Sequence, residues 1–144
     1  MKLEEIHSSW AEDNKLTVIG LESAISDVPK MHAKYLRMMS EEKMTLRRME
    51  EERKQLYKLK HDYYSGVLPE EDLRSNGWEP NRLKILKSDM GLHLDADQDI
   101  IKSNLKLAMQ QEKVDVLEQI IRHIGNRGFL IKSMIDWQKF QVGA

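Results

Sequence analysis

Apolar residues recur at helical spacing along most of the chain, and no run alternates apolar and polar residues for long enough to predict a β-strand. The first such pattern lies near the N-terminus, where Leu3, Ile6 and Trp10 share one face of a short helix. A polar break at residues 12–14 follows. The sequence therefore predicts an all-α protein whose first element is a short amphipathic helix.

The longest helical pattern comes next. Ser26 or Asp27 can cap its N-terminus, and Pro29 is tolerated in a first helical turn. No further proline and no glycine occurs before Gly66. We expect one helix of about forty residues, near 60 Å long at a rise of about 1.5 Å per residue. A small domain cannot cover both sides of such a helix, so it should pack against other helices or other copies of the chain.

Turn-forming residues dominate the segment after this helix. Pro69 precedes a short helical stretch at residues 70–75, and a run rich in helix breakers extends from Asn76 to Pro80. A brief apolar and basic piece follows at residues 83–86. We interpret residues 67–96 as a connector.

Two further helices are predicted after the connector. Asp95 or Asp97 can cap a helix that runs to Ile124, and Gly125 is expected to end it. The last helix should extend from about Gly128 to Gln141. The predicted fold is thus an all-α fold with a long helix and a C-terminal helical hairpin.

These elements fit one helical domain over residues 1–144. We divide it into an N-terminal segment at 1–26, a long basic helix at 27–66, the connector at 67–96 and C-terminal assembly helices at 97–144.

The charges are segregated although the net charge is only −1. Residues 43–64 hold seven Lys or Arg against four acids, whereas residues 68–99 hold eight acids against four bases. A near-neutral total therefore hides a basic helix, which is the kind of surface that binds nucleic acid.

A helical projection of the long helix separates two faces at about 100° per residue. An apolar packing seam gathers on one side: Met31, Tyr35, Met38, Met49, Leu56 and Tyr63. A cationic stripe gathers within about 60° on another: Lys43, Arg47, Lys54, Lys58 and His61. Glu50 and Glu51 lie in or beside this stripe, so a salt-bridged solvent face remains an alternative interpretation.

The projection also separates the two lysines near the end of this helix. Lys58 continues the cationic stripe, whereas Lys60 emerges near Tyr57 and Tyr64, where its ammonium group is expected to reach solvent. Lysines neutralise phosphates and tyrosine rings offer faces for unpaired bases. We predict Lys58 and Lys60 as phosphate contacts, with these further candidates: Arg47, Lys54, His61, Tyr57 and Tyr64.

The C-terminal helices carry more apolar surface than one chain can cover. The apolar face shifts midway along residues 97–124, which favours self-association over a kinked hairpin within one chain. The last helix presents a broad apolar face, and we predict that these residues on it mediate oligomerisation: Phe129, Leu130, Met134, Trp137 and Phe140.

Several classes of function lack support in the sequence. No glycine-rich phosphate loop and no nucleophile elbow occurs, the five histidines have no metal-binding spacing, and cysteine is absent. We therefore expect no enzyme activity, no metal and no cofactor. No apolar stretch is long enough for a signal or a membrane span, which predicts a cytoplasmic protein.

Two motifs stand out in the sequence. The first has the form basic-x-basic-x-Asp-Tyr-Tyr-Ser-Gly and spans Lys58 to Gly66. The second combines Arg127-Gly128-Phe129 with Ile131-Lys132, Phe140 and Gly143. With these motifs, nearly the whole chain resembles the UvsY family of recombination mediators from tailed bacteriophages. Lys60 stands where the family usually has Arg, and His61 replaces an apolar residue.

This resemblance implies a protein without catalytic activity that binds single-stranded DNA and forms a ring-like homo-oligomer, hexameric or heptameric. It implies that the protein helps a RecA-like phage recombinase replace the phage single-strand-binding protein, in the cytoplasm of an infected bacterial host cell. The family's basic motif is associated with DNA binding and its C-terminal region with assembly.

Two other functions remain open at the level of sequence. A coiled-coil-like structural or scaffolding protein would use the cationic stripe only as a solvated face and would not bind DNA. A helix-turn-helix repressor would prefer duplex DNA, but no compact recognition helix is evident.

Overall fold

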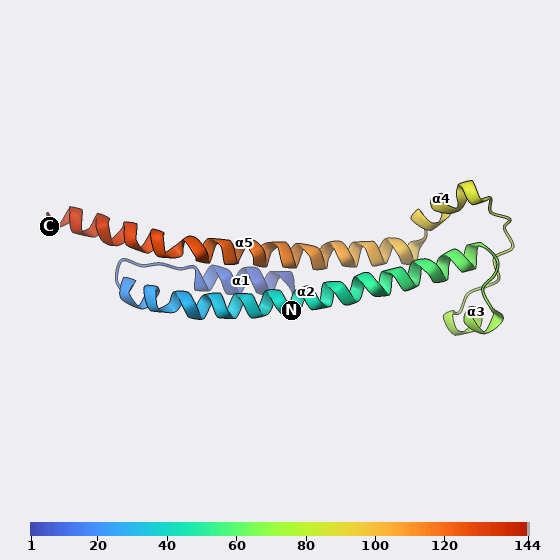
Figure 1. The fold of residues 1–144 in the computed structure, drawn as a ribbon, viewed down its shortest axis with the longest axis horizontal. Helices are drawn as coiled ribbons and strands as arrows, with labels where there is room; N and C mark the ends of the chain where they lie inside the picture. Colours follow the sequence, from blue (N-terminus) through green and yellow to red (C-terminus); the bar gives the residue numbers. More distant parts are fainter. Residues whose placement is uncertain (144) are drawn as a thin grey trace. The chain divides into compact units, whose positions relative to one another are not determined.

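The computed structural model describes residues 1–143, and these residues form helices and no β-strand (Figure 1). The helices are α1 (Leu3–Asp13), α2 (Leu21–Tyr64), α3 (Glu70–Asn76), α4 (Met90–Asp95) and α5 (Gln98–Gln141), with a 3₁₀ turn at Lys87–Asp89 before α4. The predicted all-α fold class is confirmed.

The chain forms two compact units. The terminal unit contains Met1–Met44 and Gln110–Ala144, and the central unit contains Thr45–Met109. Both α2 and α5 have 44 residues and run from one unit into the other.

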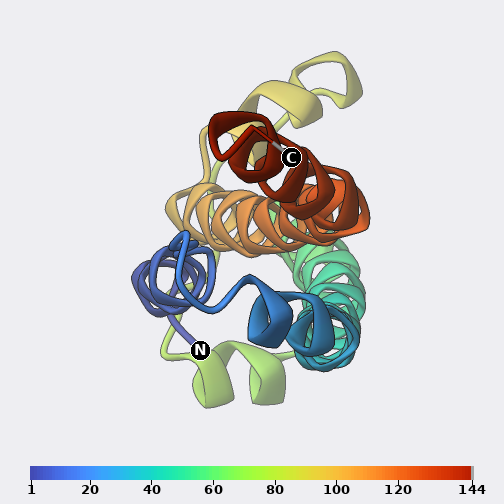
Figure 2. The same ribbon diagram turned by 90° about the vertical axis from the view of Figure 1, so that its left-hand side faces the viewer.

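The terminal unit packs three helices around one core. In the end-on view of Figure 2, α1 lies beside the first half of α2 and the second half of α5. The buried side chains are Ile6, Met31, Tyr35, Met38, Leu117, Ile120 and Ile124. Trp10 of α1 packs its ring edge-on against Tyr35, with the ring centroids 5.4 Å apart. The predicted apolar faces of α1 and of the first part of the seam therefore meet in this core.

The start of α2 differs from the prediction. The helix begins at Leu21, just after Gly20 with its φ of 98°, and Pro29 lies inside the helix instead of in its first turn. An interior proline costs about 3 kcal/mol because one backbone hydrogen bond is lost. Burial of Leu21, which is 5% exposed, offsets part of this cost by adding a turn to the packed helix.

The predicted C-terminal hairpin is wrong, because α5 continues through Gly125 and Gly128 to Gln141. Each glycine costs a helix about 1 kcal/mol relative to alanine. The residues around them, Ile124, Arg127 and Ile131, are nevertheless fully buried on one face at helical spacing. Tertiary packing thus outweighs the local preference of glycine for a break.

Arg127 explains part of this packing. The residue is 2% exposed, and its guanidinium donates a 2.9 Å hydrogen bond from Nη1 to Asn14 Oδ1. Longer hydrogen bonds of 3.4–3.5 Å reach the backbone carbonyls of Asp13, Asn14 and Lys15. Arg127 therefore satisfies carbonyl groups at the C-terminal end of α1 that have no partner inside that helix. The expected interhelix turn at Gly125–Gly128 is instead a helical contact with α1.

The central unit pairs the second half of α2 with the first part of α5. α2 ends at Tyr64, and Gly66 adopts a φ of 76°, the left-handed conformation that commonly follows a helix. The predicted short helix at residues 70–75 is confirmed by α3. Asp97 caps α5 through Oδ1, which accepts hydrogen bonds from the backbone N–H groups of Asp99 and Ile100 at 2.9 and 3.1 Å.

Candidate nucleic-acid interface

The cationic stripe occupies the exposed side of α2, away from its packing seam. Lys54 and Lys58 have side chains that are 70% and 80% exposed, and Arg47 is also exposed. In the seam, Met49 and Leu56 are half-buried. Helical periodicity therefore places these cations on the surface as predicted.

Acidic residues on the same helix pair with two of these cations. Lys54 Nζ lies 3.0 Å from Glu51 Oε1, and Lys58 Nζ lies 2.8 Å from Asp62 Oδ2. The hydrogen bond that Lys58 donates to Asp62 raises the pKa of Lys58, so that lysine is charged at any physiological pH. Exposed ion pairs of this kind contribute little free energy, and a phosphate group can replace the carboxylate. These ion pairs reduce the net positive charge of the cationic stripe but leave its cations accessible to phosphate.

The other members of the stripe differ in their surroundings. Arg47 has no ion-pair partner within residues 1–143. Lys43 lies 3.3 Å from Glu118 across to α5, and His61 Nδ1 lies 3.8 Å from Asp62 Oδ1. Arg47 is thus the cation with the most freedom to meet a phosphate.

Lys60 lies in a different environment, and the expectation that its ammonium group reaches solvent is wrong. The residue is 5% exposed, and Nζ lies 2.8 Å from Asp99 Oδ2 and 3.1 Å from Asp97 Oδ2. The same nitrogen lies 4.0 Å from the centroid of the Trp78 ring. A phosphate could reach this ammonium only by displacing a carboxylate or the connector. The phosphate contact of Lys60 stays a prediction.

We call Lys60, Asp97, Asp99, Tyr64 and Trp78 the lysine cluster. It joins three parts of the central unit: the end of α2, the connector and the start of α5. The Tyr64 hydroxyl donates a 2.6 Å hydrogen bond to Asp97 Oδ2. The lysine cluster therefore holds the end of α2 against the connector and the start of α5.

Burial and hydrogen bonding act on the titration of this cluster in opposite directions. Burial disfavours the charged form of Asp97, but hydrogen bonds from Tyr64, the Ile100 backbone and Lys60 outweigh it and lower the pKa. Burial, together with the negative Asp97, raises the pKa of the Tyr64 phenol. At neutral pH the carboxylate is charged and the phenol is protonated, as their hydrogen bond requires.

The substitution Asp97→Asn should therefore reveal a pH-dependent contribution to stability. Because the folded-state pKa of Asp97 lies below the ordinary value of 3.8, its ionised form stabilises the fold above that pH. This contribution is lost as pH falls through the folded-state pKa. Urea unfolding followed by circular dichroism should give a difference in free energy of unfolding between the two proteins that is constant above about pH 4 and shrinks below it. A difference that widens in acid would contradict this assignment.

The tyrosines of the first motif lie in packed and exposed positions. Tyr63 packs between Tyr64 and Trp78, with centroid distances of 5.3 Å to each, and its hydroxyl donates to the Glu79 carbonyl at 2.8 Å. Tyr64 is half-buried in the lysine cluster. Tyr57 is 39% exposed beside Arg53. Of these rings, Tyr57 is the most accessible to a base.

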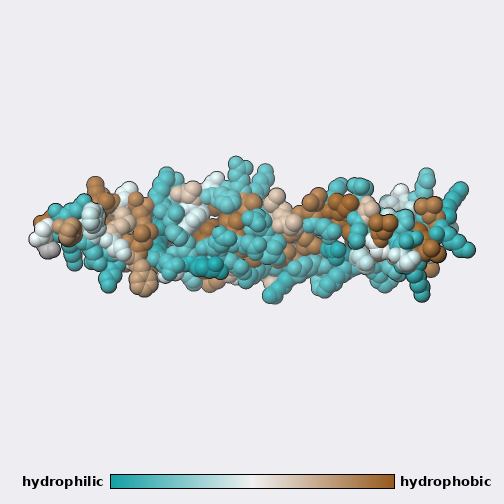
Figure 3. Space-filling view, turned by 90° about the horizontal axis from the view of Figure 1, so that it is seen from above, coloured by the Kyte–Doolittle hydropathy of each residue, from teal (hydrophilic) through white to brown (hydrophobic). Residues whose placement is uncertain are grey.

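The predicted oligomerisation residues lie on the last turns of α5. Phe129 and Phe140 are 75% and 73% exposed, Leu130 and Trp137 are also exposed, and Met134 is half-buried. The Trp137 and Phe140 rings stack with their centroids 5.6 Å apart. Figure 3 shows apolar side chains at the surface toward this end of α5, at the left of the view. Within residues 1–143 nothing covers these side chains fully.

Sequence reasoning missed the partners of Lys60. Asp97 and Trp78 lie far from Lys60 along the chain. The sequence identified Asp97 only as a possible helix cap and Trp78 only as a residue of the connector, and neither role indicates a contact with a lysine. In the sequence, only the departure of a lysine from the cationic stripe toward the seam indicated a different role.

The described part of the chain offers no site for a metal and no membrane span. No group of three or more His, Asp or Glu side chains is arranged to hold a metal ion, and no helix is both long and apolar enough to cross a membrane.

Comparison with known proteins agrees with the fold and the motifs. A family model described as the recombination, repair and ssDNA binding protein UvsY matches residues 9–144. The recombination protein uvsY of Enterobacteria phage T4 is 28% identical over 143 residues, which cover 99% of each chain.

Solved structures give the same result. Crystal structures of the bacteriophage T4 recombination mediator protein UvsY in lattice types II and IV match with TM-scores of 0.83 and 0.84. The first is 27% identical and covers 99% of this chain and 98% of its own, and the second is 26% identical and covers 97% and 99%. A long basic α2, a motif from Lys58 to Gly66 that ends it, and a family match over nearly the whole length lead to one conclusion: this chain belongs to the UvsY family of recombination mediators.

Proposed function

We propose that this protein binds single-stranded DNA along the cationic stripe of α2, without catalytic activity of its own. The exposure of Arg47, Lys54 and Lys58 on the side of α2 opposite its packing seam carries the proposal. Cations on a solvent-facing helix can neutralise phosphates and release counterions, which gives binding without base-sequence preference. Tyr57 and His61 are exposed on the same half of the helix and extend the proposed contact.

The proposed assembly is a homo-oligomeric ring, hexameric or heptameric, formed through the exposed apolar side chains near the C-terminal end of α5. Their exposure supports this proposal because soluble monomers rarely present several large apolar side chains together. In such a ring the cationic stripes of neighbouring subunits would act together on one strand. Many weak phosphate contacts would then add up through effective concentration.

The proposed role is to help a RecA-like phage recombinase replace the phage single-strand-binding protein and begin its filament. The family membership supports this role. A ring that holds the strand by its phosphates leaves bases available to the recombinase, and ATP hydrolysis would belong to the recombinase. The host cytoplasm is the compartment in which this reaction would occur.

A double substitution of exposed cations tests the DNA-binding proposal. Arg47→Ala with Lys58→Ala should weaken binding to single-stranded oligonucleotides of any sequence, because two phosphate contacts are lost. The slope of log affinity against log salt should become shallower by about 1.4, that is, about 0.7 for each phosphate. Fluorescence anisotropy across a salt series measures both quantities.

The matched control is Lys30→Ala with Arg122→Ala, which removes two exposed cations from the terminal unit. This variant should keep the wild-type slope. Equal slopes for all three proteins would contradict the proposed surface, and no binding by the wild type at low salt would favour a scaffolding protein.

A further inference from the structure

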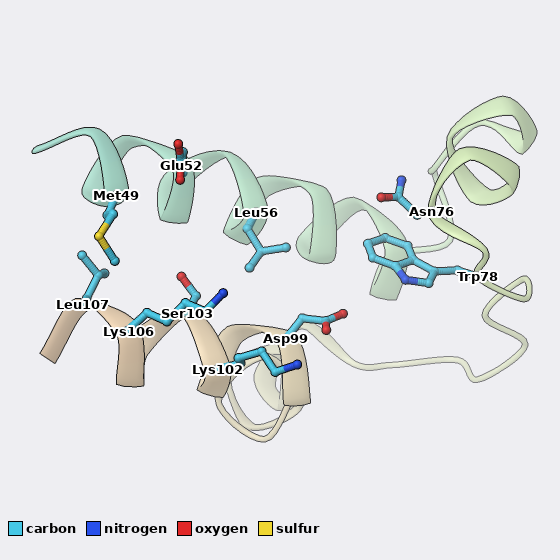
Figure 4. A pocket seen from close by; sticks show the side chains of 10 residues that line it. All are labelled: Met49, Glu52, Leu56, Asn76, Trp78, Asp99, Lys102, Ser103, Lys106 and Leu107. Carbon is cyan, nitrogen blue, oxygen red and sulfur yellow. The ribbon is translucent and has the colours of Figure 1, made fainter. Parts of the chain in front are cut away.

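The central unit contains a cleft (Figure 4), and no residue of the cationic stripe lines it. Its volume is about 490 Å³, within the range of about 300–1,000 Å³ that is usual for small-molecule sites. The half-buried Met49 and Leu56 of α2 and Leu107 of α5 give it apolar walls. The indole of Trp78 lines the end nearest the connector.

The Trp78 ring is held firmly in place. Lys60 Nζ lies 4.0 Å from its centroid, and Tyr63 packs edge-on with a centroid distance of 5.3 Å. Lys60 is itself fixed by Asp97 and Asp99. A rigid aromatic ring at the end of a cleft loses little conformational entropy when a flat ligand stacks on it.

Two lysines on α5 border the same cleft. Lys102 and Lys106 lie one helical turn apart, about 6 Å along the axis at 1.5 Å per residue. Both are exposed, and neither has an ion-pair partner within residues 1–143. Like charges four residues apart repel each other on a helix, so an anion at this position would relieve an unfavourable interaction.

The carboxylates of the cleft do not cancel this charge. Glu52 Oε1 lies 3.8 Å from Arg48, and Asp99 Oδ2 lies 2.8 Å from Lys60. Lys60 is shared between Asp99 and Asp97, so these acids and their basic partners together carry a charge of −1. Lys102 and Lys106 add +2, which leaves a net charge of +1 around the cleft. A cleft with apolar and polar walls, an aromatic end and two cations that have no ion-pair partner suits a flat ring attached to phosphates.

We propose that this cleft binds one unpaired nucleotide of the DNA strand, with its base against Trp78 and its neighbouring phosphates on Lys102 and Lys106. The proposal rests on the proposed function and adds a second contact surface, on α5 and the connector, to the stripe on α2. It gives the protein a base-dependent contribution to affinity, because stacking needs a base but not a particular one.

The test uses the full chain and compares a strand that has bases with one that lacks them. Trp78→Leu should weaken binding of an oligothymidylate about tenfold, the order expected when one stacked base is lost. The same substitution should leave binding of an abasic oligonucleotide of equal length unchanged. Trp78→Phe keeps a ring in the cleft and should restore most of the affinity for oligothymidylate. Thermal unfolding by circular dichroism should show that the variants compared are folded.

Two further experiments test the lysine contacts and whether the bound nucleotide belongs to the DNA strand or is a free mononucleotide. Lys102→Ala with Lys106→Ala should make the salt slope shallower by about 1.4 for both strands. Photo-crosslinking of an oligonucleotide with 5-iododeoxyuridine should label the peptide that contains Trp78. Free thymidine monophosphate at the same nucleotide concentration should not prevent the crosslink, because it lacks the contacts with the stripe.

The outcomes separate this inference from the proposed function. If the wild type did not bind single-stranded DNA at low salt, both the cleft and the proposed function would be contradicted. Two results would overturn only the cleft, provided that binding still depends on Arg47 and Lys58. In the first, Trp78→Leu weakens binding of the oligothymidylate and of the abasic oligonucleotide by the same factor. In the second, Trp78→Leu leaves binding of both unchanged. Protection of Trp78 from crosslinking by the free mononucleotide would identify the cleft as a nucleotide site and overturn its role in binding the strand.

Discussion

Replacement of Lys60 with alanine is expected to lower the free energy of unfolding by about 3–5 kcal/mol, the usual cost of removing one partner from a buried ion pair. Asp97 would remain buried without the ammonium group that lies 3.1 Å away, and Trp78 would lose the cation 4.0 Å from its ring. Urea unfolding followed by circular dichroism measures this loss. Lys58→Ala, which removes an exposed lysine two residues away, should leave the free energy of unfolding unchanged.

The partners of Lys60 offer a rescue that separates folding from DNA binding. The triple variant Lys60→Met, Asp97→Asn and Asp99→Asn removes the two buried charges together with the exposed carboxylate of Asp99, and asparagine at residue 97 can still cap α5. It should recover most of the stability lost in Lys60→Ala. If the rescued protein binds single-stranded DNA as tightly as wild type, Lys60 acts by positioning the end of α2. A stable triple variant with weaker binding would instead support direct contact of Lys60 with phosphate. Failure of the triple variant to recover stability would contradict the assigned ion pairs.

Replacement of Trp137 and Phe140 with serine is expected to convert the proposed oligomer into a 16.9 kDa monomer. Both residues are largely exposed in the single chain, so their substitution removes apolar surface from the proposed interface without opening the core. Each aromatic ring that a neighbouring subunit buries contributes about 1.5–3 kcal/mol. In the proposed ring-shaped oligomer the same contact occurs at every subunit boundary, so the substitution removes this free energy of association at each boundary. Light scattering coupled to size-exclusion chromatography measures the mass.

The matched control is Leu36→Ser with Met44→Ser, which replaces two exposed apolar side chains of α2 in the same unit. This variant should keep the mass of the wild-type assembly. Substitution is a cleaner test than truncation after Arg127, because truncation would also remove Ile131, which is fully buried. If the Trp137 and Phe140 variant kept its assembled mass, the subunit contact would lie elsewhere.

Periodicity sufficed to predict most of the fold. The face that joins Met31, Tyr35 and Met38 is buried, and the opposite face of α2 carries the exposed cations. The positions of helices follow from apolar residues that repeat about every 3.6 residues. This repeat can be seen in the sequence before the elements that the helix packs against are known. A cap at Asp95 or Asp97 was also predictable, since capping depends on local backbone geometry, and Asp97 is the residue that caps α5.

The misjudged features depend on contacts between distant residues. Gly125 favours a helix end locally, but Ile124 lies in the core shared with α1 and α2, Arg127 hydrogen-bonds Asn14 just after α1, and Ile131 is fully buried. This packing keeps α5 continuous. Lys60 was expected in solvent because a lone lysine usually is, yet two acids that follow it by more than thirty residues hold it inside the fold. No pattern of single-residue preferences encodes such pairings.

The division of the chain into units has a consequence for synthesis. The central unit is one continuous stretch, Thr45–Met109, whereas the terminal unit needs both ends of the chain, because Arg127 hydrogen-bonds residues that precede it by more than a hundred positions. Loop-closure entropy makes such distant contacts slow to form. We therefore expect the half of the protein that contains the lysine cluster to fold while the ribosome is still adding residues, and α1 to dock only after the second half of α5 has been synthesised.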